Sequence, residues 1–259
     1  MDKYIKIGRL NYAVGMAGMG ILQFFFPGFR PVFIPAWPEW LPDPQIFIYL
    51  TSVALIIFGV CVVFNFNAKK LSLLLGIFLL LLLILFHILF RLANNPESLG
   101  SWTDDLKILA LAGGAFILAG SFPSGENSPA VHPWPEKFIP LGPIFFGVMM
   151  IAFGIDHFLY DQFVVTLVPA WIPFPLFWTY FAAIALIGSG ISFITKIKIR
   201  LVGLLTAIML FAWFLILHIP RAIATPDQAN GNEITSVFQA LAFSGVALVA
   251  AFTLRPRKP

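Results

Sequence analysis

The sequence contains almost no cysteine. Cys61 is the only one among 259 residues, so the chain can form no intramolecular disulfide and carries no CxxC motif. Thiol–disulfide exchange by the chain alone is therefore excluded, as are iron–sulfur and zinc sites that depend on several cysteine ligands. The sequence also lacks a Walker loop, a dinucleotide-binding fingerprint and a nucleophile elbow. Whether the protein is an enzyme therefore stays open.

Charge is also scarce. Charged residues make up 11% of the chain, less than half of the roughly 25% that is usual in soluble domains. Apolar residues reach 59%, and a soluble domain could not bury that much apolar surface without exposing large patches. The sequence therefore predicts a lipid bilayer as the main solvent. The net charge of +4 is spread over short basic runs, which indicates membrane orientation and gives no case for nucleic acid binding.

Apolar runs dominate what is present. A helix needs about 20 apolar residues to cross a bilayer, and helices are favoured over barrel strands for runs of this length. Lysine and arginine are concentrated at both termini and in alternate connections between the runs, which the positive-inside rule places in the cytoplasm. We therefore expect an all-α polytopic bundle in a bacterial inner membrane, with both termini cytoplasmic. The eight expected spans are 9–26, 46–66, 71–93, 105–122, 139–160, 176–195, 201–224 and 234–253.

An internal repeat divides the chain. "IPAW" at 34–37 returns as "VPAW" at 168–171, and His87 returns as His218 at nearly the same spacing. A register kept across such different residue types predicts two four-helix units in tandem. Because four is an even number, both units enter the membrane in the same direction, as parallel repeats do. The predicted units are 1–122 and 138–259, joined by a cytoplasmic linker at 123–137.

Short motifs give each unit a family likeness. The second half carries "GIDHF" (154–158), "VPAWIPFPLFWTY" (168–180) and "LHIPR" (217–221), and the first half carries "FHILFR" (86–91). With these motifs both units, and thus nearly the whole chain, resemble the DoxX family of small four-helix membrane proteins. The first unit departs from the pattern by having Gln23 where the second has His157.

The resemblance implies a redox-associated membrane subunit or a quinone or lipid binder. Some DoxX members are associated with thiosulfate–quinone oxidoreduction or with membrane complexes that handle thiols. Because this chain has no paired cysteines, any thiol chemistry would come from a redox partner protein. Two alternatives stay open, namely a small-molecule or lipid transporter that uses the cleft between the repeats, and a non-catalytic scaffold subunit.

Ionisable residues inside or near the ends of the apolar runs are the candidates for chemistry. Charges in spanning helices normally face the bundle interior or water, so we expect a polar site near the outer leaflet, shared by the two units. Imidazoles there can relay protons, and guanidinium groups can hold an anionic headgroup or polarise a quinone carbonyl. The candidates for ligand binding or proton relay are His87, Arg91, Asp156, His157, His218 and Arg221.

A purely structural role for these residues is equally open. The arginines can snorkel to the interface and cap helix carbonyls, or form ion pairs with Glu97 and Asp227 just beyond the turns. Gly188 and Gly190 are expected to allow close helix packing. A metal or haem site is not expected, because the sequence has no HxxxH or HExxH spacing.

Two loops, 24–44 and 163–178, are apolar yet rich in proline and tryptophan. Proline breaks regular helix, and tryptophan favours the membrane interface, so the loops are expected to lie at, or dip into, the outer headgroup layer. Their aromatic side chains either wall a pocket for a lipid or quinone tail or form an anchoring belt. The candidate wall residues are Trp37, Trp40, Tyr49, Trp171, Trp178 and Tyr180.

Overall fold

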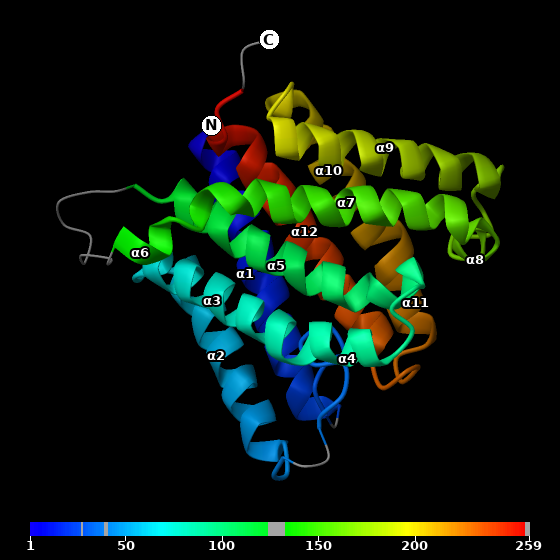
Figure 1. The fold of residues 1–259 in the computed structure, drawn as a ribbon. Coiled ribbons are helices and arrows are strands. Elements are labelled where there is room, and N and C mark those ends of the chain that lie inside the picture. Colours follow the sequence, from blue (N-terminus) through cyan, green and yellow to red (C-terminus); the bar gives the residue numbers. More distant parts are fainter. Residues whose placement is uncertain (27, 39–40, 124–132, 257–259) are drawn as a thin grey trace.

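The computed structural model describes residues 1–26, 28–38, 41–123 and 133–256, and all regular secondary structure in these residues is helical (Figure 1). A long helix occupies each of the eight predicted ranges. Shorter helical segments extend or connect them, including the π-helical turns η1 (Leu83–Ile88) and η4 (Phe214–His218). The long helices are α1 (Asp2–Phe25), α2 (Gln45–Val63), α3 (Ala68–Leu82), α5 (Thr103–Ser121), α7 (Gly142–Leu159), α9 (Pro175–Thr195), α10 (Ile199–Trp213) and α12 (Asn232–Thr253).

Within the described residues, six helical segments are long and apolar enough to cross a membrane. The other two predicted spans form α1 and α5, which carry more polar and charged residues at one end. Large apolar side chains cover the outside of the bundle, and Leu89, Ile184 and Leu201 are each more than half exposed. Such a surface is suited to lipid and unsuited to water. The six segments are Gln45–Val63, Ala68–Ala93, Trp134–Leu159, Pro175–Thr195, Ile199–Ala224 and Asn232–Thr253.

The helices pair in a regular way. α1 packs on α2, and α7 packs on α9, while α3 packs on α5 and α10 packs on α12. Across the two halves, α1 packs on α12 and α5 packs on α7, and α5 and α12 meet at the centre. Tyr4 and Phe252 stack with their ring centroids 5.0 Å apart, so the start of α1 and the end of α12 lie side by side (Figure 1).

Glycine permits the closest helix contacts. A Cβ on Gly59 would lie 2.7 Å from the Ala13 carbonyl oxygen, and one on Gly190 would lie 2.5 Å from the Gly147 carbonyl oxygen. Neither position can hold a side chain unless the helices move apart, so small residues set the distance within the α1–α2 and α7–α9 pairs. The packing role predicted for Gly190 is thereby confirmed.

The two proline-rich loops take different positions. In the α1–α2 loop, Val32, Phe33 and Ile34 are buried in the core, and the indole of Trp37 stacks on Phe86 with a centroid distance of 5.7 Å. The α7–α9 connection contains the short helix α8 (Asp161–Val165) and a turn-rich segment whose Trp171 is 72% exposed. The apolar side chains of the first loop are thus buried inside the bundle, whereas the second loop leaves Trp171 on the outside.

Candidate functional site

The structure distributes the six candidate residues over separate places. His87 and Arg91 lie with one acidic residue of α5, whereas Arg221 lies with an acidic residue of α12. His157 lines a pocket beside α9 and α10. Asp156 and His218, at the end of η4, do not line that pocket, and the buried Asp156 Oδ1 and His218 Nδ1 have no hydrogen-bond partner among the described residues. The predicted grouping around one shared hollow is therefore replaced by two ion-pair clusters and one pocket.

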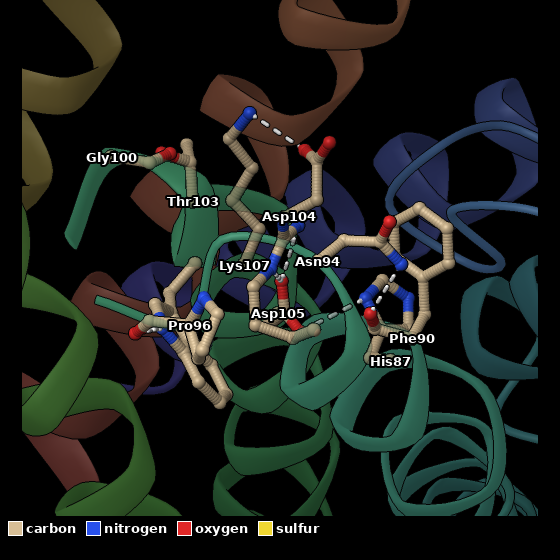
Figure 2. A network of polar contacts seen from close by, with 11 residues as sticks. His87, Phe90, Asn94, Pro96, Gly100, Thr103, Asp104, Asp105 and Lys107 are labelled. Carbon is tan, nitrogen blue, oxygen red and sulfur yellow. Dashed lines mark hydrogen bonds and ion pairs between the residues drawn. The ribbon is translucent and has the colours of Figure 1, made fainter. Parts of the chain in front are cut away.

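The first cluster is centred on Asp105 in the first turn of α5. The guanidinium of Arg91 donates to Asp105 Oδ2 from Nε and Nη2, at 3.4 and 3.2 Å. The imidazole Nδ1 of His87 lies 3.7 Å from Asp105 Oδ1. Figure 2 shows His87 and Asp105 facing each other, with the Lys107–Asp104 ion pair beside them. His87 is fully buried and Asp105 is 3% exposed, so this cluster holds α3 and its extension against α5 inside the bundle.

The second cluster has the equivalent arginine but a differently placed acid. Arg221 donates from Nη2 and Nε to the two carboxylate oxygens of Glu233, at 2.7 and 3.0 Å, which is the bidentate geometry that favours arginine. When the repeats are aligned on Arg91 and Arg221, Asp105 matches Thr235, and Glu233 matches Thr103. The acid therefore stands slightly earlier in its helix in the second half. This pair is more exposed than the Arg91–Asp105 pair.

Glu97 and Asp227 were the expected partners of the arginines, and the arginines bind Asp105 and Glu233 instead. Glu97 and Asp227 both lie in exposed turns after the helix end. The chain reverses there and begins the next helix, so an acid in the first turn of that helix reaches the arginine more directly. The acid also lies where the helix dipole favours negative charge.

A pocket of about 940 Å³ lies between α9 and α10. The end of α7, helix α8, the segment 167–173 and η4 complete its wall. Nearly all of the lining is apolar, and its middle is lined by small residues, namely Ala182, Ala185, Gly188 and Ala212. A Cβ built on Gly188 meets nothing within 4 Å. Gly188 therefore faces open space, and its predicted packing role is wrong.

The predicted wall aromatics are divided between the halves. Trp171 and Trp178 line the pocket. Trp37 lies in the inward-folded loop of the first half, Tyr49 stacks on Phe24, and the Tyr180 hydroxyl donates to Asp161 Oδ2 at 2.7 Å. Trp40 lies outside the described residues.

His157 supplies an ionisable group to the pocket. Its Nδ1 lies 2.7 Å from the Phe153 carbonyl oxygen, one helical turn earlier. Its ring stacks on the indole of Trp213, with a centroid distance of 6.3 Å and an interplanar angle of 16°. The ring is thus fixed by α7 on one side and by α10 on the other, which leaves Nε2 as its free nitrogen.

The matching residue of the first half, Gln23, has a different environment. Its side-chain amide donates to the Ser52 and Thr51 hydroxyls at 2.9 and 3.1 Å, and its Oε1 accepts from the Arg30 backbone N–H at 3.3 Å. Gln23 thereby ties the inward-folded loop to α2. When the repeats are aligned on His87 and His218, Thr51 and Ser52 match Ala182 and Ala183. No α9 hydroxyl therefore stands in for those partners at His157.

The far end of the pocket contains a hydroxyl pair. Ser189 and Thr206 lie with their hydroxyl oxygens 2.7 Å apart. In the same alignment they match Phe58 and Leu75, which are both buried in the core of the first half. Two small polar side chains thus replace two large apolar ones, a difference in residue volume between the repeats that hydropathy alone does not reveal.

No metal centre emerges from the described residues, since they contain no group of three His, Cys, Asp or Glu side chains that could hold an ion. Comparisons with family models, with curated proteins and with solved structures gave no match to the chain. The likeness to the DoxX family therefore stays a prediction.

Proposed function

We propose that this chain is an integral membrane protein that binds a lipid-soluble ligand, a quinone or a lipid, in the pocket between α9 and α10. The observation that carries the proposal is a hollow of about 940 Å³ with an almost wholly apolar lining and His157 in its wall. Ligand sites have this character, with an apolar wall and few, well-placed polar groups. Its volume lies within the usual range for small-molecule sites, roughly 300–1,000 Å³.

The surroundings of the pocket support entry from the bilayer. Phe181, Leu205 and Ile208 belong to its lining and are each more than half exposed. An opening between two apolar helices admits a molecule that is already dissolved in lipid. An apolar tail can then lie along the alanine-rich middle while a polar head reaches His157.

The proposal includes the arrangement in the membrane. Eight helices cross the bilayer as two parallel four-helix units, 1–122 and 138–259, with both termini in the cytoplasm of a bacterial cell. Matching helix pairs, matching glycine contacts at Gly59 and Gly190, and π-helical turns at His87 and His218 support the two-unit description. The contact between the start of α1 and the end of α12 agrees with an even number of crossings.

A redox role is the part of the proposal that depends on the DoxX resemblance. In this role the protein is a membrane subunit that presents a quinone-type molecule to a partner protein. The chain itself supplies no paired cysteine, so the electrons come from the partner.

Native mass spectrometry of the full chain, released from membranes in mild detergent, tests the ligand proposal. We expect a retained lipid or quinone, and we expect a Gly188→Ile, Ala212→Leu double variant to lose most of it because the new side chains occupy the hollow. Those replacements are the matching residues of the first half, Ile57 and Leu81. Ile184→Phe is the matched control, since Ile184 is exposed and does not line the pocket. Equal retention by the filled variant would contradict the proposal.

A further inference from the structure

The hydrogen atoms available in the pocket define what kind of polar head it accepts. The Nδ1 of His157 lies 2.7 Å from a backbone carbonyl oxygen, and a carbonyl oxygen only accepts. Nδ1 must therefore carry the proton. In the neutral ring Nε2 is then an acceptor with a free lone pair. No carboxylate belongs to the described lining, so nothing there compensates the charge of an imidazolium.

The other polar groups of the lining have already used their hydrogens. The Thr179 hydroxyl donates to the Pro175 carbonyl at 3.0 Å, and the Thr206 hydroxyl donates to the Val202 carbonyl at 2.8 Å. Because Thr206 has only one hydroxyl hydrogen, Ser189 is the donor in the 2.7 Å pair that they form. The Trp178 indole donates to the Pro173 carbonyl at 3.1 Å.

The indoles of Trp171 and Trp213 do not distinguish one polar head group of a ligand from another. Trp171 and Trp213 carry N–H groups that any oxygen-bearing head can use, whether it is a hydroxyl or a carbonyl. The lining includes no lysine or arginine among the described residues, so an anionic head would have no counter-charge in a site with little water. The one unsatisfied requirement of the pocket is thus a donor for His157 Nε2.

We propose that the pocket is specific for an uncharged lipid that bears a hydroxyl group, whose O–H donates to His157 Nε2 while its tail lies between α9 and α10. A quinol fits this description, and so does a long-chain alcohol, whereas a quinone lacks the hydrogen and a fatty acid anion or phospholipid brings a charge. This inference rests on the proposed function of the same pocket and narrows its ligand to the hydroxyl-bearing form.

The test uses the full chain in mild detergent and four probes with the same tail: a quinol under anaerobic conditions, its quinone, its di-O-methyl ether and a saturated alcohol. Binding is followed through the fluorescence of the tryptophans in the pocket wall. We expect the quinol to bind about tenfold more tightly than its ether and its quinone, because only the quinol donates a hydrogen bond to the free Nε2 of His157. If the alcohol binds as tightly as the quinol, the pocket accepts any long-chain lipid with a hydroxyl group. If the alcohol binds as weakly as the ether, the pocket is selective for a quinol. Either result supports a hydroxyl donor.

His157→Leu provides the second measurement, and it is expected to bring the quinol to the affinity of its ether. Wild-type protein that binds the quinol, the quinone and the ether equally, or the quinone most tightly, overturns the hydroxyl inference and leaves the pocket proposal in place. Failure of all four probes to bind, with no loss on filling the pocket by Gly188→Ile and Ala212→Leu, overturns the pocket proposal as well. The wild-type comparison of quinol with ether decides the inference even where a His157 variant folds poorly.

Discussion

The two halves of this protein place similar helix pairs in similar contacts and use the space between them differently. In the first half the loop folds into the bundle, where Val32 and Phe33 are buried and Trp37 packs against Phe47 of α2 and Phe86 of η1. Between α9 and α10 the corresponding loop stays outside, and a pocket of about 940 Å³ remains. The comparison shows that similar helix pairs enclose a filled core or an open pocket, depending on the position of the loop and on a few lining side chains.

The difference begins at one position of the first helix. Gln23 forms hydrogen bonds to α2 and to the backbone of Arg30, and so it holds the loop inward. Arg30 is itself fully enclosed, donates to the Asn230 carbonyl at 2.5 Å, and has its pKa lowered by burial. His157 has none of these partners in the second half, and its ring binds its own helix and Trp213. Glutamine at this position thus anchors a loop, whereas histidine lines a pocket.

The largest expected effect concerns the ion pairs. Asp105→Asn removes the charge that compensates Arg91 inside the bundle, and we expect it to lower the free energy of unfolding by about 3–5 kcal/mol, as for other buried pairs. Glu233→Gln is the matched change in the second half and should cost about 1 kcal/mol, because Arg221 is 34% exposed and remains solvated. Thermal or denaturant unfolding in mild detergent measures both. Equal losses of unfolding free energy would contradict the expectation that the more buried pair, Arg91–Asp105, depends more strongly on its carboxylate.

The next effect concerns the loop anchor. Gln23→Leu breaks hydrogen bonds to Ser52, Thr51 and the Arg30 backbone, and we expect a loss of about 3 kcal/mol at about 1 kcal/mol for each bond. Amide hydrogen exchange in residues 28–38 should rise by more than tenfold, since the loop loses its tie to α2. His157→Leu is the counterpart and should cost less than about 1 kcal/mol, because one bond to its own helix is lost. A larger loss from His157→Leu than from Gln23→Leu would contradict the anchor role.

The smallest effect concerns the tryptophans. Trp37→Ala removes aromatic stacking on Phe29 and Phe86 and should cost about 2 kcal/mol, somewhat less than the truncation of a fully buried aromatic residue. Trp171→Ala should leave the free energy of unfolding within about 0.5 kcal/mol, because its side chain is 72% exposed. Its effect should appear in probe binding instead. Unfolding curves and binding measured on the same preparations separate the two outcomes, and a stability loss shared by both variants would show that both loops are structural.

Much of the fold follows from the sequence. Hydropathy and length located all eight long helices, because apolar runs bounded by charge and proline leave few alternatives in a bilayer. The ion-pair partners of the two arginines could not be predicted from the sequence. Arg91 and Arg221 bind acids in the first turn of the next helix, although Glu97 and Asp227 lie closer to them along the chain. That choice depends on where the turn directs the chain.

The pocket was harder to predict for a different reason. It is produced by small side chains such as Ala212 and Gly188, and glycine in a membrane helix indicates close packing as readily as it indicates a space. His157 was recognised as a candidate, but its role depends on Ala182 and Ala183 standing where the first half has Thr51 and Ser52. The comparison of aligned positions, combined with the geometry of α9 and α10, is needed to tell small residues that allow close packing from small residues that leave a pocket.

The pairing of each opening helix with the closing helix of the opposite half has a consequence for how the chain is assembled. Neither half has a complete set of neighbours, since α1 rests on α12 and α7 rests on α5. A half expressed alone would expose to lipid the glycine-containing helix faces that normally contact the other half. The two halves, expressed as separate fragments in one cell, should therefore associate.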